Sequence, residues 1–141
     1  MFLEPARRKI EKTLLSRFFP DFRFDGEAVR GTMICNSGRQ YQLTVSLGQF
    51  PIGPPSVMVV VPTLRNASGK ILGEGGASSG MHHLGRDASG ALRLCLASRR
   101  KHDPRDTLYK SLLKSRLWLE AYEAHLRTGN PIDELLAHEK N

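Results

Sequence analysis

A single α+β domain over residues 1–141 is the fold class that the sequence predicts, and the order of its segments carries this prediction. A helix-length segment near the N-terminus is followed by four short segments typical of strands, and a long helical pattern lies in the C-terminal third. The connections between the strand-like segments are short, which favours antiparallel neighbours. We therefore expect an N-terminal helix, a four-stranded antiparallel meander, a long loop, a long C-terminal helix and a short tail helix.

The first predicted helix covers residues 4–19. Pro5 suits the first turn of a helix, and Pro20 ends it because proline disfavours a helical residue before it. Apolar residues recur at a spacing of four along this segment and predict a stripe that faces the core. These residues are Ala6, Ile10, Leu14 and Phe18.

Four predicted strands follow, and turn signals separate the first three. The strands lie at Phe22–Phe24, Val29–Asn36, Tyr41–Leu47 and Ser56–Val61. The turn signals are Asp25-Gly26 and Asn36-Ser37-Gly38. The third strand alternates apolar and polar residues, so one of its faces is expected to be buried. The fourth is rich in β-branched residues and is expected to be buried on both faces.

A corner and a long loop flank the fourth strand. Three prolines within Phe50–Pro55 restrict the backbone and predict a rigid corner. Residues 63–90 carry many glycines and no periodicity, and so long a loop inside a compact domain is either functional or disordered. This loop leads to Cys95. A long helix is then predicted from Asp103, a possible cap, and Pro104, and a short tail helix from Pro131 with Asn130 as its cap.

The chain carries a formal net charge of +7, which suits either a nucleic acid or an acidic protein surface as a partner. Aromatic residues are not interleaved with the basic ones, and no nucleic-acid-binding motif is present, so nucleic acid is the weaker interpretation. No apolar run is long enough to cross a bilayer, and the N-terminal residues lack the order of a signal peptide. We therefore expect a cytoplasmic protein.

The two cysteines, Cys35 and Cys95, are too few for a disulfide framework or a zinc site, so we expect no metal and no cofactor. A lone cysteine is most often a small buried hydrophobe, and Cys35 on a predicted strand fits that description. Cys95 has a different context, because a glycine-rich loop precedes it and a basic turn follows it. Basic neighbours favour the thiolate, which is the reactive form. They are Arg93, Arg99, Arg100 and Lys101.

Several motifs resemble one family when they are taken in order. Phe50–Pro55 resembles the Tyr/Phe-Pro-x-x-Pro-Pro corner of ubiquitin-conjugating enzymes, and Leu94-Cys95-Leu96 resembles the cysteine and leucine of that family's active site. The helical half resembles the stand-alone conjugating enzymes of bacterial antiphage operons. It does so at Asp103-Pro104, Thr107-Leu108, Trp118-Leu119, Tyr122-Glu123 and Thr128-Gly129. The resemblance covers almost the whole chain and implies a ubiquitin-conjugating-like fold.

The resemblance also implies a catalytic role for Cys95. The thiol would receive a C-terminal acyl group from an activating enzyme, hold it as a thioester and pass it to an amine of a target protein. The acyl donor would be a ubiquitin-like protein or, in a cyclic-oligonucleotide signalling system, the nucleotide cyclase. The expected partner-binding residues are Arg8 and Lys12, which share a face of the first helix, and Pro54 and Pro55 of the corner.

Near the cysteine the sequence departs from the family. The family has a His-Pro-Asn motif whose Asn helps to stabilise the oxyanion, whereas this chain has Met81-His82-His83-Leu84. The family's Trp-x-Pro appears as His102-Asp103-Pro104. An imidazole can donate to an oxyanion or take a proton from an attacking amine. We therefore expect His83, then His82, then His102 as catalytic companions of Cys95, although each is also explained as an ordinary loop residue.

Two other classes of protein stay open. A non-catalytic module of the same fold would bind ubiquitin-like proteins without cysteine chemistry, and the missing His-Pro-Asn motif favours it. The retained Cys95 argues against it. A basic nucleic-acid-binding protein is supported by composition alone, and its signature would be binding that weakens steeply as salt is raised.

Overall fold

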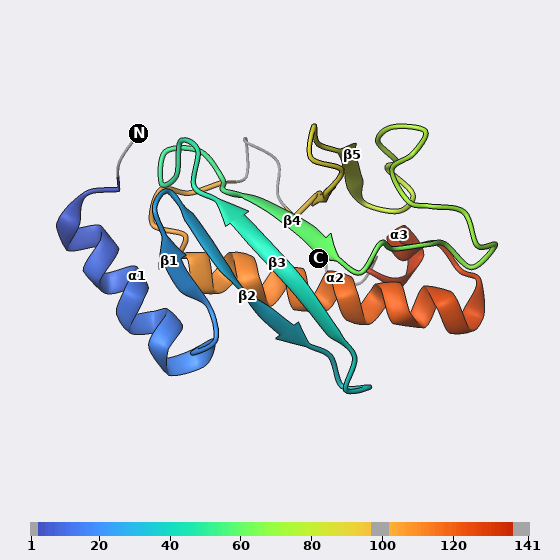
Figure 1. The fold of residues 1–141 in the computed structure, drawn as a ribbon, viewed down its shortest axis with the longest axis horizontal. Coiled ribbons are helices and arrows are strands. Elements are labelled where there is room, and N and C mark those ends of the chain that lie inside the picture. Colours follow the sequence, from blue (N-terminus) through green and yellow to red (C-terminus); the bar gives the residue numbers. More distant parts are fainter. Residues whose placement is uncertain (1–2, 97–101, 137–141) are drawn as a thin grey trace.

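A computed structural model describes residues 3–96 and 102–136, and it shows an α+β arrangement with an N-terminal helix, an antiparallel sheet and a long C-terminal helix (Figure 1). The elements are α1 (Pro5–Phe18), β1 (Arg23–Asp25), β2 (Ala28–Ile34), β3 (Gln40–Ser46), β4 (Ser56–Val61), β5 (His83–Arg86), β6 (Leu92–Leu94), α2 (Leu108–Thr128) and α3 (Ile132–Leu135). Within the described residues, every helix is too short or too polar to cross a membrane.

The sheet has six strands in the order β1-β2-β3-β4-β6-β5, and every neighbouring pair is antiparallel. The predicted meander of four strands is present, but it is extended at β4 by two strands that the sequence does not predict. Both are short, and β5 contains Gly85 at a φ of 84° beside an irregularity in its pairing with β6. Such a strand has no alternating pattern to detect, and it depends on pairing with its neighbour.

Helix α2 crosses one face of the sheet, while α1 lies alongside β1 (Figure 1). The core lies between α2 and the sheet, because Leu112, Trp118 and Leu119 of α2 are buried together with the inward residues of β2 and β3. Those inward residues alternate along the strands and are Val29, Met33, Tyr41, Leu43 and Val45. The alternation predicted for the third strand is therefore confirmed.

The buried face of α1 is not the predicted apolar stripe. Ile10 and Phe18 are 55% and 46% exposed, whereas Leu15 and Glu11 are buried. The helix is turned so that the Glu11 carboxylate reaches the start of α2, and this polar contact decides which face is covered. Burial of a carboxylate is tolerated only when hydrogen-bonding partners surround it.

Those partners come from both helices. Glu11 Oε1 accepts the backbone N–H of Leu108 at 2.9 Å, and Oε2 accepts Arg7 Nε at 2.7 Å. Arg7 also donates to the carbonyl oxygens of Pro104 and Asp106, each at 2.7 Å. Helix α1 therefore fixes the segment that leads into α2, and a carboxylate at the N-terminus of α2 also suits the helix dipole.

The ends of the helices differ from the predicted caps. Helix α2 begins at Leu108, later than predicted, because the Thr107 hydroxyl accepts the N–H of Lys110 and serves as the cap. Helix α3 is preceded by Pro131 without a side-chain cap, so the capping role predicted for Asn130 is wrong. Strand β4 is also not buried on both faces, since Val60 and Val61 are exposed near the end of the strand.

We expect Glu11→Ala to lower the free energy of unfolding by about 3 kcal/mol or more, because Arg7 and the Leu108 N–H both lose a buried acceptor. Urea denaturation followed by Trp118 fluorescence measures this change. The exposed Glu74→Ala serves as control and should shift the value by less than about 0.5 kcal/mol. Equal losses in the two variants would show that the Glu11 contacts are not stabilising.

Candidate functional site

Cys95 directly follows β6, and its side chain is exposed. Its backbone N–H donates to the carbonyl oxygen of His82 at 3.0 Å. Strand β6 itself lies between β4 and β5 in the sheet. The thiol is therefore presented to solvent from a backbone that the sheet and one further hydrogen bond hold in place, as a nucleophile requires.

The turn that contains His82 is held by three separate contacts. The carbonyl oxygen of His82 also accepts the indole N–H of Trp118 at 2.9 Å. The His82 imidazole Nε2 lies 2.6 Å from Asp133 Oδ1, and the backbone N–H of Asp133 donates to the carbonyl of Gly80. These contacts support a positive φ of 50° at His82, which is uncommon for a residue with a side chain. The backbone carbonyl of His82 thus positions Cys95, while the imidazole of His82 contacts Asp133.

His83 lies on the buried side of β5 and pairs with Leu94 of β6. It is 3% exposed, and its ring Nδ1 accepts the N–H of Gly85 at 3.1 Å. Burial, with the nearby charge of Arg86, lowers the pKa of His83, so the ring is neutral at pH 7. His83 is therefore buried with Leu94 rather than exposed with Cys95. The structure gives no support to His83 as the first catalytic companion of Cys95, because the His83 side chain is buried in the core.

A pocket of about 180 Å³ adjoins the chain on both sides of Cys95, although Cys95 is not among its lining residues. Leu94 and Leu96, the two neighbours of Cys95 in the chain, both line it. Pro54 and Pro55 of the predicted corner line the same pocket, and so does His102. The structure therefore brings together the corner, one of the three predicted histidines and the residues that flank the thiol.

His102 has a defined tautomer in this pocket. Its Nε2 lies 2.7 Å from the carbonyl oxygen of Pro51, and its ring centroid lies 6.3 Å from that of Phe50. A carbonyl oxygen only accepts hydrogen bonds, so Nε2 carries the proton in the neutral ring and Nδ1 keeps a lone pair. Among the three predicted histidines, His102 is the one that lines the pocket together with Leu94 and Leu96, the chain neighbours of Cys95.

Arg8 and Lys12 share a face of α1, as predicted, because both cations lie against the ring of Phe24. The guanidinium carbon of Arg8 is 4.5 Å and the Lys12 ammonium 5.7 Å from the ring centroid. This face lies at the β1 edge of the sheet, apart from the pocket beside Cys95. The basic residues Arg99, Arg100 and Lys101, expected to favour the thiolate, lie outside the described residues.

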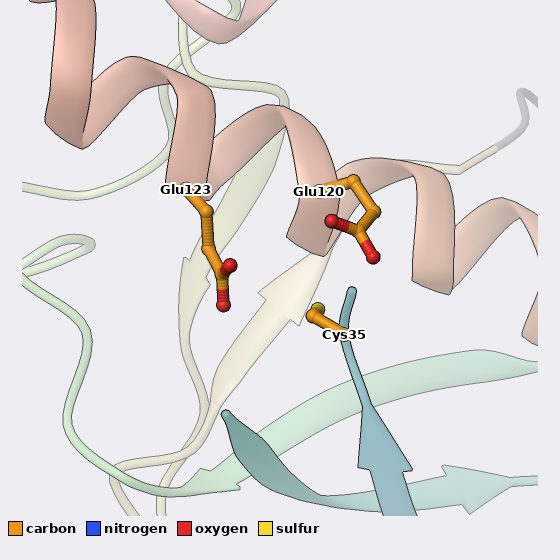
Figure 2. A group of neighbouring side chains, drawn as sticks. All are labelled: Cys35, Glu120 and Glu123. Carbon is orange, nitrogen blue, oxygen red and sulfur yellow. The ribbon is translucent and has the colours of Figure 1, made fainter. Parts of the chain in front are cut away.

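The second cysteine belongs to a different cluster. Cys35 is buried after β2, as predicted, and points toward Glu120 and Glu123 of α2 (Figure 2). One ligand atom from each of the three residues lies within 4.8 Å of the others, so this group has the composition to hold a metal ion. Burial and the two negative charges raise the pKa of the Cys35 thiol to about 12.

Each carboxylate of this cluster already accepts a hydrogen bond from the β2–β3 hairpin. Glu120 accepts the backbone N–H of Asn36 at 2.7 Å, and Glu123 accepts the Tyr41 hydroxyl at 2.5 Å. The cluster therefore joins α2 to the hairpin, and a protonated thiol completes it as a donor. Sequence reasoning missed the two glutamates, because only the packing of α2 brings them to the hairpin.

No family model, no curated protein and no solved structure matches this chain. The chemistry assigned to the site therefore rests on the geometry around Cys95. That geometry consists of an exposed cysteine, an anchored backbone and a neighbouring pocket that His102 lines.

We expect the two cysteines to differ strongly in reactivity with iodoacetamide at pH 8. A pKa of about 12 leaves about one Cys35 thiol in ten thousand ionised, and its burial blocks the reagent further, whereas Cys95 is exposed. Mass spectrometry should find one label on the native protein, located on Cys95, and two labels after unfolding in urea. Cys95→Ala should remove the native label, and rapid labelling of Cys35 in the native protein would contradict its buried, protonated state.

Proposed function

We propose that this chain is a ubiquitin-conjugating-like enzyme that carries a ubiquitin-like protein, or another C-terminal acyl group, as a thioester on Cys95. The observation that carries the proposal is an exposed cysteine whose chain neighbours, Leu94 and Leu96, line a pocket together with the proline corner and His102. The order of helix, antiparallel meander, corner, cysteine and long helix supports the corresponding fold. We place the enzyme in the cytoplasm and in bacterial antiviral defence, within a ubiquitin-like conjugation operon or a cyclic-oligonucleotide signalling system.

The reaction has two acyl transfers. In the first, the Cys95 thiolate attacks the thioester carbonyl on an activating enzyme, a new C–S bond forms, and the thiolate of the activating enzyme leaves. In the second, an amine of the target protein attacks the Cys95 thioester, a C–N bond forms, and the Cys95 thiolate leaves. The attacking amine must lose a proton, and an imidazole with a free lone pair is suited to accept it.

His102 is the group that we assign to this proton transfer. Its Nε2–H is engaged with the carbonyl of Pro51, which orients the ring and leaves Nδ1 as the basic atom. His102 lines the same pocket as Leu94 and Leu96, so its ring is near the backbone that carries the thiol. The other two histidines are otherwise engaged, because Asp133 holds the His82 ring and the core holds that of His83.

Arg8 and Lys12 would contact the activating enzyme from the outer face of α1. Their charged groups lie over the ring of Phe24, which gives a cationic surface with a fixed position. An acidic surface on the activating enzyme would complement it. Pro54 and Pro55 line the pocket beside the thiol and would contact the acyl donor or the target protein.

We expect a reductant-labile adduct of the donor protein on Cys95 when this protein is produced with the products of its neighbouring genes. Intact-mass analysis before and after treatment with dithiothreitol detects the thioester. Cys95→Ser should give an adduct that survives the reductant, because an ester resists thiol exchange. Cys35→Ala is the matched control and should keep the labile adduct. A folded wild-type protein that forms no adduct with its activating enzyme would instead indicate a non-catalytic binding module.

We expect His102→Gly to slow the discharge of a preloaded thioester to free lysine by about a hundredfold or more, while loading from the activating enzyme is little changed. Single-turnover gel assays across a range of pH measure both steps. Added imidazole should restore discharge in the variant and leave the wild-type rate unchanged. An equal loss in loading and discharge without rescue by imidazole would assign His102 to structure alone.

A further inference from the structure

Three basic residues line the pocket that adjoins the chain at Cys95. They are Arg93 of β6 and two lysines from the first turns of α2, Lys110 and Lys114. Asp106 is the one carboxylate among its lining residues. Cations therefore outnumber carboxylates among these lining residues.

The single carboxylate of the pocket is already engaged. Asp106 Oδ1 accepts Lys110 Nζ at 3.0 Å, and Oδ2 accepts the backbone N–H of Asp103 at 3.2 Å. The hydrogen bond from Lys110 lowers the pKa of Asp106, so this carboxylate is ionised at pH 7 and offsets the charge of Lys110. It does not offset the charge of Arg93.

Arg93 supplies an independent observation. Its Nε atom is buried, and it has no hydrogen-bond partner among residues 3–96 and 102–136. A buried donor on a cation is costly to leave unpaired, so the site is complete only when an acceptor enters. The planar guanidinium favours a carboxylate, which can accept two parallel hydrogen bonds.

The size and position of the pocket agree with such a ligand. Its volume of about 180 Å³ exceeds that of several waters, each of which takes about 30 Å³ in the liquid, so an acidic side chain fits. Leu94 and Leu96 line the pocket on either side of Cys95 in the chain. The pocket therefore adjoins the backbone that carries the thiol, and an extended tail joined to the thiol, at about 3.3 Å per residue, reaches it within a few residues.

Resting on the function proposed above, we propose that this pocket selects an acyl donor whose C-terminal tail carries an acidic side chain a few residues before the end. Arg93, which lines the pocket, forms the charged hydrogen bonds to that carboxylate. A donor tail with a neutral or basic residue at the same position would leave Arg93 Nε unpaired. This difference would let the pocket distinguish acidic tails from other tails.

The test uses short acetylated and amidated peptides, because the amide imitates an acyl end without a free carboxylate. One series carries a single Glu two, three or four residues before the end, and the control series carries Gln. Titration into the full-length protein, followed by ¹⁵N NMR, should show that one Glu peptide binds about tenfold or more tightly than its Gln counterpart. Shifts should centre on the Arg93 side chain and the amides of Leu94 and Leu96, and binding should weaken as salt is raised.

Two variants separate charge from geometry. Arg93→Gln should lose about tenfold in affinity or more, and Arg93→Lys, which keeps the charge and loses the planar fork, should be intermediate. The matched control is Lys70→Gln, in the loop that packs on the C-terminal half of α2 near His125, and it should bind as the wild type does. An unchanged NMR spectrum elsewhere in each variant verifies that the fold is intact.

Three outcomes would overturn the proposal: equal binding of the Glu and Gln peptides, no effect of Arg93→Gln, or binding of inorganic phosphate as tight as that of the best Glu peptide. Peptide binding involves no thioester, so its failure is distinct from a failure to form the Cys95 adduct. A protein that forms the adduct and ignores the acidic peptide would keep the proposed function and lose this inference.

Discussion

The carbonyl oxygen of His82 holds the candidate site together. It accepts the backbone N–H of Cys95 and the indole N–H of Trp118, which uses both of its lone pairs. Trp118 is 1% exposed and belongs to the core, so the backbone at the thiol is tied directly to the most rigid part of the protein. Asp133 secures the same turn from α3. A change in the packing of α2 would therefore move the thiol.

A second chain of contacts links α1 to the pocket. Arg7 holds the carbonyls of Pro104 and Asp106, and Glu11 holds the first N–H of α2. The Asp106 side chain, which lines the pocket, then pairs with Lys110. The helix expected to meet the activating enzyme thus also fixes one wall of the proposed acyl-donor site. The backbone of that wall is held by contacts about a hundred residues apart in the sequence.

The three histidines show how far residue type can be taken as evidence for a site. The sequence places His82, His83 and His102 near Cys95 and predicts His83 as the first catalytic companion, then His82, then His102. The structure uses them for different purposes: His83 fills the core, His82 positions the cysteine through its backbone, and His102 faces the pocket. His82 lies in the turn before β5 and its ring contacts Asp133, whereas His83 is buried on β5, so the two histidines do not act as one unit.

Local chemistry determined much of the fold from the sequence alone. Pro5 and Pro20 bracket α1, alternation marks β3, and the left-handed Gly129 ends α2, because each depends only on neighbours in the chain. The exposed Cys95 and the pocket lining by Pro54 and Pro55 also agree with the motifs that singled out these residues.

Only tertiary packing decided the rest. The buried face of α1 follows the Glu11 carboxylate, and β5 and β6 exist because β4 offers an unpaired edge. The unpaired Nε of Arg93 and the lone pair of His102 are likewise set by partners distant in the sequence. A sequence shows which groups a chain has, whereas burial and hydrogen bonding between distant segments determine which of those groups stay available for chemistry.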